Sequence, residues 1–198
     1  MNTFNTQVSM HTRNIGFSIY TGLTKGAPYQ TYLDGPGGED PGFTNLANMG
    51  VNPNTTGITT NAAGAITFTP ILSLSSIFMV RWICYFIPDI TGYWYFSGSG
   101  VKSTLALFIM PRSYGTFGSL EGTYSYILAL NNATAGYANS GSNTILLTAN
   151  TKYYFYLTYS NISGSGAAFN FYVGRPQTVG GTGSAANQTR DFSNYLYY

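Results

Sequence analysis

The sequence predicts an all-β protein: a two-sheet antiparallel β-sandwich, jelly-roll-like, with long loops and flexible terminal arms. Aromatic residues make up 17% of the chain, and this composition suits pleated, half-buried strands better than helices. Short apolar runs alternate with segments rich in Gly, Pro, Asn and Asp, which favour turns. No helical apolar period of useful length and no fixed-period repeat is present. Short strands at regular spacing indicate a sandwich or a barrel.

The predicted core is centred on residues 77–109, which contain both tryptophans and the only cysteine. Strands are expected at residues 78–87, 93–96 and 103–109, with a turn at 88–92 and a glycine-bearing loop at 97–102. The turn is indicated by Pro88 and Gly92, because Pro presets φ and Gly adopts conformations that other residues avoid. The core residues expected from this pattern are Trp82, Tyr85, Trp94, Phe96 and Phe155.

Apolar–polar alternation predicts further strands on both sides of this centre. They are expected at residues 14–20, 64–69, 123–130, 143–147, 151–159 and 167–173. The last two are expected to form a hairpin, because a short glycine turn separates them. Along residues 151–159 the period of two places Tyr154 and Tyr156 on one face and Phe155 on the other. Residues 20–53 are expected to be mostly a long surface loop, because turn residues are dense there.

A length of 198 residues suits one domain with extensions. We expect an N-terminal arm at residues 1–13, the β-sandwich at 14–175, and a Gly/Thr-rich linker with an aromatic C-terminal tail at 176–198. Residues 1–13 have no apolar core and no cleavage pattern, so no secretory signal is expected. Apolar runs are far shorter than the about 20 residues of a membrane helix, so no membrane insertion is expected.

The chain carries very little charge. Charged residues are 7% of the sequence, against roughly 25% in an average soluble domain. The net charge of +2 comes from 8 scattered basic and 6 acidic residues. The absence of a Lys/Arg run argues against a nucleic-acid partner. A nearly uncharged surface rich in Tyr, Asn, Ser and Thr favours a protein that packs against neighbours or binds neutral ligands.

Titratable side chains are too few to predict a catalytic centre. His11 is the only histidine and lies in the polar arm, and Cys84 lies in an apolar run, where a buried small hydrophobe is expected. One Cys and one His cannot form a zinc cluster. Arg81 lies inside an apolar strand, so we expect it to stack on an aromatic ring or to pair with Asp89 or Glu121. No catalytic residue is assigned, and the protein is predicted not to be an enzyme.

Three collinear segments carry a family resemblance. They are Gly22-Leu23-Thr24 with Tyr29-Gln30-Thr31-Tyr32, the Trp-containing segment 80–88 with its aromatic partner 91–96, and residues 147–159 with their Asn150-Thr151-Lys152-Tyr153-Tyr154 approach to a strand. Together, over about residues 20–173, they resemble the protective-antigen-type domain and its GLEYA relatives in fungal adhesins. The resemblance implies a two-sheet β-sandwich. Similar domains occur in adhesins and in some virion proteins.

The sequence departs from this family at its metal site. Members that bind calcium and sugar usually carry two acidic residues just after the aromatic strand, where this chain has Ser97-Gly98-Ser99-Gly100. Calcium requires six to eight oxygen ligands, usually including carboxylates. We therefore expect no cofactor and no metal site. The remaining weak calcium candidates are Asp34, Glu39 and Asp40, in a loop where a solvated turn is the favoured interpretation.

The excess of aromatic residues predicts surfaces for interaction. The candidates are Tyr154 and Tyr156 on one strand face and Phe192, Tyr195, Tyr197 and Tyr198 in the tail. The tail is expected to become ordered by docking onto a neighbour, so that its deletion would weaken assembly and leave the sandwich folded. We predict a non-enzymatic structural protein of an assembly, a minor capsid or surface component of a large virus, located in the virion. Its partners would be other copies or other proteins of that assembly.

A second function remains open. The family resemblance and the expected surface tyrosines also suit a carbohydrate-binding adhesin module whose partners are neutral glycans. Such a protein would be located at the cell surface or outside the cell, with a leader missing from this sequence. The absent acidic pair argues against the calcium-dependent form of this module.

Overall fold

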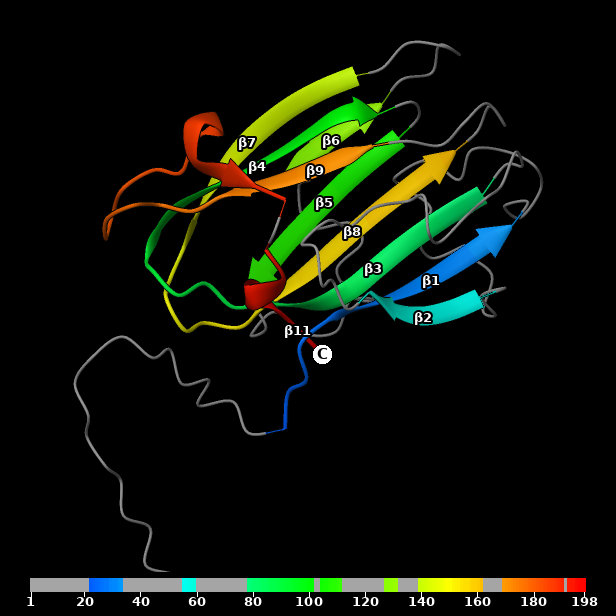
Figure 1. The fold of residues 1–198 in the computed structure, drawn as a ribbon, viewed down its shortest axis with the longest axis horizontal. Coiled ribbons are helices and arrows are strands. Elements are labelled where there is room, and N and C mark those ends of the chain that lie inside the picture. Colours follow the sequence, from blue (N-terminus) through cyan, green and yellow to red (C-terminus); the bar gives the residue numbers. More distant parts are fainter. Residues whose placement is uncertain are drawn as a thin grey trace, which may run out of the picture.

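Two antiparallel β-sheets face each other in the computed structural model, which describes residues 22–33, 55–59, 78–101, 104–111, 127–131, 139–161, 169–190 and 192–198 (Figure 1). One sheet has the order β2-β1-β3-β8-β5-β6 with β11 beside β3, and the other has the order β10-β9-β4-β7. The predicted β-sandwich is therefore confirmed. The strands are β1 (Ala27–Leu33), β2 (Thr55–Thr59), β3 (Phe78–Phe86), β4 (Gly92–Val101), β5 (Thr104–Pro111), β6 (Leu128–Asn131), β7 (Asn139–Leu147), β8 (Tyr153–Asn161), β9 (Asn170–Gly174), β10 (Gln188–Thr189) and β11 (Leu196–Tyr197).

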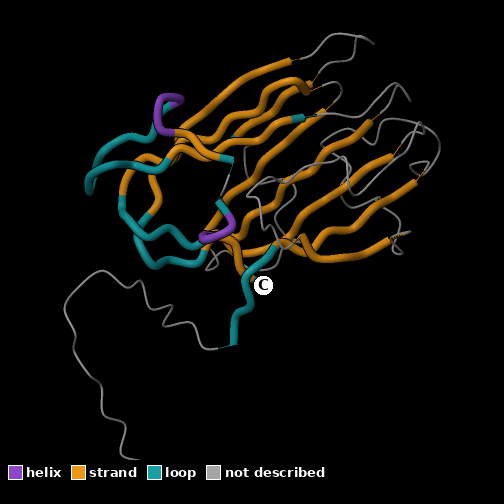
Figure 2. Tube along the Cα trace, in the orientation of Figure 1, coloured by secondary structure: helices purple, strands orange, loops and turns teal. Residues whose placement is uncertain are grey.

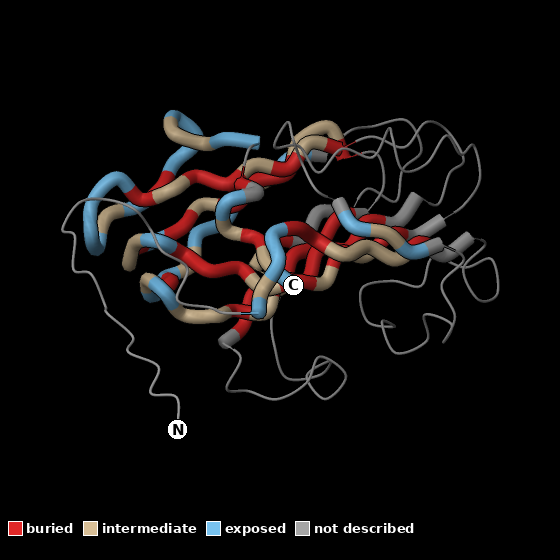
Figure 3. Tube along the Cα trace, turned by 60° about the horizontal axis from the view of Figure 1, so that its bottom comes forward, coloured by how far each residue is buried: buried red, intermediate tan, exposed pale blue. Residues whose placement is uncertain are grey.

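The core lies between the two sheets, and Figure 3 shows its buried positions in red along the strands. Trp82, Trp94, Phe96 and Phe155 are each 0% exposed. Tyr85 was expected among them, but it faces the other side of its sheet, because strand alternation turns its neighbours on β3 inward. There its ring stacks on the ring of Tyr154, with 5.4 Å between the centroids.

Aromatic rings from both sheets meet edge to face in this core. Phe86 on β3 meets Trp94 and Phe96 on β4, with centroid distances of 5.2 and 5.6 Å. Phe155 on β8 meets Phe171 on β9 at 6.2 Å and an interplanar angle of 77°. Such pairs contribute about 0.5–1.5 kcal/mol beyond the burial of their area. The aromatic residues that predict strands in the sequence therefore also join the two layers.

Two predictions about individual strands are wrong. Residues 97–101 belong to β4 rather than to a loop, because β7 and β9 pair with that strand on both sides. The register of the β4–β7 pair shifts between Gly98 and Val101. The predicted hairpin of β8 and β9 does not form: β8 pairs with β3 and β5, whereas β9 pairs with β4 and β10 in the other sheet. The two strands therefore lie in opposite sheets, where Phe155 and Phe171 pack edge to face.

Other strand boundaries follow the sequence pattern less closely. Strands β1 and β2 form within or just after the region expected to be a long loop, and β7 begins four residues before the predicted start. The strands predicted at 14–20 and 64–69 lie outside the described residues, as do 123–126 of the strand that ends in β6. The N-terminal arm, His11 and Glu121 also lie outside them.

The C-terminal residues join both sheets instead of forming a linker and a free tail. After β9 the chain forms the short 3-10 helix η4 (Ala185–Asn187), pairs with β9 through β10, then forms η5 (Ser193–Tyr195) and pairs with β3 through β11. The backbones of Thr24 and Tyr198 exchange two hydrogen bonds, of 3.0 and 2.9 Å. The tail thus docks within its own chain, and its expected docking onto a neighbour stays a prediction. Phe192 and Leu196 of the tail are buried in this protein's own core.

The Gly-rich part of this segment packs closely against the second sheet. A Cβ on Gly174 would lie 2.8 Å from the carbonyl oxygen of Ser184, and one on Gly183 would overlap the carbonyl of Gly174. The N–H of Tyr93 donates to Gly181, and the N–H of Gly183 donates to Tyr93, at 2.8 and 2.7 Å. Here glycine permits contact between two backbones. Residues 181–183 thereby pair with the start of β4, beyond the end of β9.

Cys84 is buried in β3, and its thiol is expected to be unreactive. It is 4% exposed, and burial raises the pKa of the thiol above its ordinary value. Because the thiolate is the reactive form, we expect no labelling of the native protein by Ellman's reagent in the time that the urea-unfolded protein needs to react completely. Fast labelling without denaturant would contradict the burial of this strand.

Candidate functional site

Three chain segments meet at one end of the sandwich, and we call this region the loop end. They are residues 87–91 between β3 and β4, residues 148–152 between β7 and β8, and residues 175–183 after β9. Figure 2 shows them in teal on the same side of the molecule, and Figure 3 shows exposed positions there in pale blue. Loops held by a rigid scaffold are the usual location of binding residues.

Hydrogen bonds to the side chain and the backbone of Thr91 fix the three segments to one another. Its hydroxyl oxygen accepts from the N–H of Ala149 at 2.9 Å, and its carbonyl oxygen accepts from the N–H of Gly180 at 2.8 Å. Pro88 adds a third link, because its carbonyl oxygen accepts from the N–H of Asn150 at 2.8 Å. Asn150 has φ of 58°, a left-handed conformation that Asn tolerates better than most residues. The loop end is therefore a preorganised surface.

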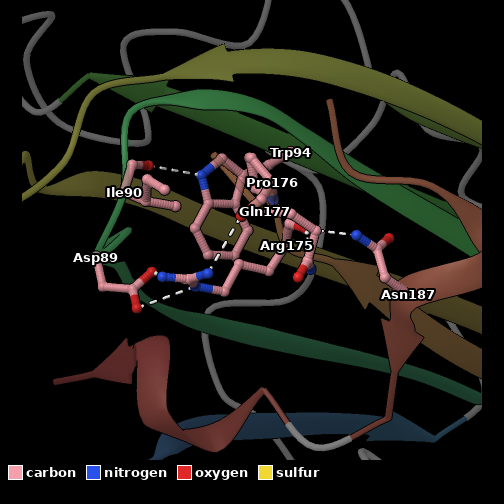
Figure 4. A network of polar contacts seen from close by, with 7 residues as sticks. All are labelled: Asp89, Ile90, Trp94, Arg175, Pro176, Gln177 and Asn187. Carbon is pink, nitrogen blue, oxygen red and sulfur yellow. Dashed lines mark hydrogen bonds and ion pairs between the residues drawn. The ribbon is translucent and has the colours of Figure 1, made fainter. Parts of the chain in front are cut away.

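An ion pair between Asp89 and Arg175 lies at the surface of the loop end (Figure 4). The Nε–H of Arg175 lies 3.0 and 3.1 Å from the two carboxylate oxygens, and one terminal nitrogen donates to the carbonyl of Pro176 at 3.2 Å. The carboxylate raises the pKa of the guanidinium. The side chains are 36% and 50% exposed, and exposed ion pairs contribute only about 0–1 kcal/mol to stability. Both charged groups are accessible to a ligand.

Polar side chains hold the backbone of Arg175 in place (Figure 4). The carbonyl oxygen of Arg175 accepts hydrogen bonds from Asn187 at 2.8 Å and from Gln177 at 3.3 Å. The other amide atom of Asn187 accepts from the N–H of Ser184 at 2.7 Å, which joins η4 to the network. The indole N–H of Trp94 donates to the carbonyl of Ile90 at 3.1 Å. The buried indole thus anchors the loop that carries Asp89.

An apolar pair borders the loop end on the outer face of the second sheet. Tyr93 and Leu146 face each other across β4 and β7 and are 44% and 51% exposed. Because Tyr93 follows the 87–91 loop directly, its ring and the Asp89 carboxylate come from one short stretch of sequence, whereas Arg175 comes from the segment after β9. An exposed aromatic ring beside polar groups is a common feature of ligand sites.

Acidic side chains are scarce in the described part of the loop end. Asp89 carries the one described acidic side chain, and Arg175 already binds it. No group of three His, Cys, Asp or Glu side chains lies together among the described residues. The weak candidates Asp34, Glu39 and Asp40 lie outside the residues that the structure describes. Residues 97–100 lie inside β4, between two paired strands, rather than in a loop.

Arg81 binds one residue that was not among its expected partners. Its Nε–H donates to the amide oxygen of Gln30, which lies opposite it on β1. Asp89 pairs with Arg175 instead, and Glu121 lies outside the described residues. The strand register explains this hydrogen bond, because Gln30 is the direct cross-strand neighbour of Arg81 on the same face.

The predicted interaction residues fall into buried and surface groups. Phe192 is 1% exposed and Tyr156 is 4% exposed, so neither presents its ring to a partner. Tyr195 is half-buried against Trp94, with 4.9 Å between the ring centroids. Tyr154 and Tyr197 are half-buried, and Tyr198 is 38% exposed. The sequence interpretation did not assign Tyr93 or Arg175 to a site, although Tyr93 begins a predicted strand and Arg175 follows another by two residues.

Among the described residues no helix is long and apolar enough to cross a membrane. No family model and no curated protein matches the sequence. The structure is similar to the A domain of epithelial adhesin 9 from Candida glabrata in complex with Galb1-3GlcNAc. The TM-score is 0.61 at 15% identity, over 88% of this chain and 89% of that one. The A domain of epithelial adhesin 6 from the same organism, in complex with Galb1-3GlcNAc, gives 0.61 at 17% identity over 91% and 89%.

A third similar structure has a different description. It is an anti-sigma factor domain-containing protein from Clostridium clariflavum, with a TM-score of 0.51 at 19% identity, over 87% of this chain and 47% of that one. The likenesses establish that this chain has the fold of adhesin A domains, in agreement with the fold that the family resemblance implies. None of these three structures is a virion protein. One fold serves several functions, so the function must be argued from the site.

Proposed function

We propose that this protein is a non-enzymatic, adhesin-like carbohydrate-binding module that acts outside the cell or at a cell surface and binds neutral glycans at the loop end. The main support is the likeness in fold to two adhesin A domains, each in complex with Galb1-3GlcNAc and each covered over 89% of its length. This assignment is the second of the two functions that the sequence suggests.

The chemistry of the loop end suits a sugar. Sugar hydroxyls donate and accept hydrogen bonds, and the accessible Asp89 carboxylate and Arg175 guanidinium offer strong partners of both kinds. The apolar face of a sugar ring packs on aromatic rings, and Tyr93 offers an exposed one at the edge of the same loop. The hydrogen bonds to Thr91 keep these groups in place before binding, which lowers the entropic cost of binding.

The virion-assembly function has less support. It relied on a sticky C-terminal tail, and that tail supplies Phe192 and Leu196 to the protein's own core. The low surface charge suits a lectin for neutral sugars equally well. The glycan-binding proposal therefore takes precedence over the capsid interpretation.

Binding is tested with Galb1-3GlcNAc and lactose by ligand-observed NMR and calorimetry, with and without EDTA. We expect binding that EDTA does not change, because no group of three His, Cys, Asp or Glu side chains lies together among the described residues. We expect Asp89→Asn and Arg175→Gln to weaken binding at least about tenfold, equivalent to 1.4 kcal/mol. Thermal stability should change little, since the pair is exposed.

Ile58→Thr is the matched control, because Ile58 is 45% exposed on β2 at the far edge of the other sheet. This variant is expected to bind like the wild type. The proposal fails if a panel of neutral glycans gives no binding. It also fails at this site if both charge variants bind as well as the control. Loss of binding in EDTA would instead indicate a metal site among residues outside the described ranges.

A further inference from the structure

The outer face of the second sheet carries a polar cluster away from the loop end. Its members come from three neighbouring strands and the residue after β10, and we call them the Tyr172 cluster: Ser97, Ser99, Tyr172, Gln188 and Arg190. Ser97 and Tyr172 are direct cross-strand neighbours on β4 and β9. Ser97 lies four residues along β4 from Tyr93, which corresponds to about 13 Å at the rise of a strand.

Hydrogen bonds hold this cluster together. A terminal nitrogen of Arg190 donates to the phenol oxygen of Tyr172 at 3.0 Å, and its guanidinium carbon lies 5.2 Å from the centre of the ring. The hydroxyl of Ser97 donates to the amide oxygen of Gln188 at 2.9 Å. The hydrogen bonds from Arg190 and Ser99 lower the pKa of Tyr172, with Arg190 the larger influence. The guanidinium is therefore positioned by its neighbours rather than free to rotate.

Arg190 gives this cluster a positive charge, and no carboxylate among the described residues forms an ion pair with it. Arg190 is exposed, and the single described ion pair of the molecule joins Asp89 to Arg175 at the loop end. Asp191, the next residue, lies outside the described ranges. A guanidinium has five N–H donors in a planar fork, which matches the two oxygens of a carboxylate. One contact with Tyr172 leaves an edge of that fork for a ligand.

We propose that the Tyr172 cluster is a second glycan site, which binds the carboxylate of an acidic sugar such as a sialic or uronic acid. Arg190 binds the carboxylate in the bidentate manner, and the ring of Tyr172 orients the guanidinium. Ser99 and Gln188 supply neutral groups for the sugar hydroxyls around it. This inference uses other residues, which lie farther along β4 on the same outer face, so it does not depend on the loop end. It adds a class of ligand to the neutral glycans proposed there.

Binding of 3′-sialyllactose is compared with binding of lactose, which lacks the acidic sugar. We expect wild type to bind the acidic saccharide at least about tenfold more tightly at low ionic strength. We expect that preference to shrink as salt rises, because the ion pair is exposed. Arg190→Gln should remove the preference, and Arg190→Lys should restore only part of it, because Lys keeps the charge but lacks the fork. Ile58→Thr should leave the preference intact, because Ile58 lies at the far edge of the other sheet.

The outcomes separate this inference from the proposed function. Binding of 3′-sialyllactose without binding of lactose supports the Tyr172 cluster and opposes the loop-end site. Equal affinity of wild type for the two saccharides overturns the inference, whatever the loop end binds. An unchanged preference in Arg190→Gln, with the same melting temperature as wild type, overturns it as well. Equal or tighter binding of a sulfated lactose would overturn the assignment to a carboxylate.

Discussion

Deletion of residues 192–198 is expected to unfold the sandwich rather than to leave a folded domain without its tail. The deletion removes Phe192, whose ring lies 5.5 Å from that of Phe171 and 6.4 Å from that of Phe155. It also removes Leu196, which is 4% exposed, and the pairing of β11 with β3. Loss of a buried Phe side chain alone costs about 3–5 kcal/mol. This loss is a large share of the roughly 5–15 kcal/mol that stabilises a typical domain.

The deletion is measured beside point variants by urea unfolding, with the fluorescence of Trp82 and Trp94 as the signal. Phe192→Ala is expected to lower the free energy of unfolding by about 4 kcal/mol. Tyr198→Ala is the control, because its side chain is 38% exposed, and we expect a change within about 0.5 kcal/mol. A truncated protein with a wild-type unfolding curve would show that the tail is dispensable. That result would return the tail to the role of a segment for docking onto a neighbour.

The sequence predicts the centre of this fold well because the alternation there is unambiguous. Strand β3 runs from Phe78 to Phe86, within one residue of the predicted range, and its inward residues are aromatic or apolar. Which strands pair with one another is harder to predict. The pattern of β8 and β9 suits a hairpin as well as a crossover, because both strands turn one aromatic face inward. What separates them is the packing of Phe155 on Phe171, which depends on the whole sandwich.

The candidate site is hard to predict because its residues are far apart in the sequence. Asp89 and Arg175 are separated by 86 positions, and an isolated Arg after a strand carries no signal for its partner. The role of the Gly-rich segment after β9 is also hard to predict. Its composition is that of a flexible linker, yet the structure uses its glycines for close contact between backbones. Composition alone cannot distinguish a glycine that confers freedom from one that permits close packing.

Gly183→Ala is expected to displace residues 181–183, which belong to the loop end. We expect it to lower the free energy of unfolding by about 3 kcal/mol. The added methyl group would overlap the carbonyl of Gly174 and lie 3.2 Å from the backbone nitrogen of Tyr95. Backbone cannot rotate away as a side chain can. Relief therefore requires movement of residues 181–183 and loss of their two hydrogen bonds with Tyr93.

The matched control is Thr182→Ala, because Thr182 is exposed and adjoins the same contact. We expect its urea midpoint to lie near that of wild type. Amide hydrogen exchange gives the second measurement: the N–H of Tyr93 should lose protection in Gly183→Ala and keep it in the control. A Gly183→Ala protein that is as stable as the control and equally protected would show that the backbones are not in contact. Because Arg175 precedes this segment and Gly180 pairs with Thr91, a true displacement should also weaken glycan binding at the loop end.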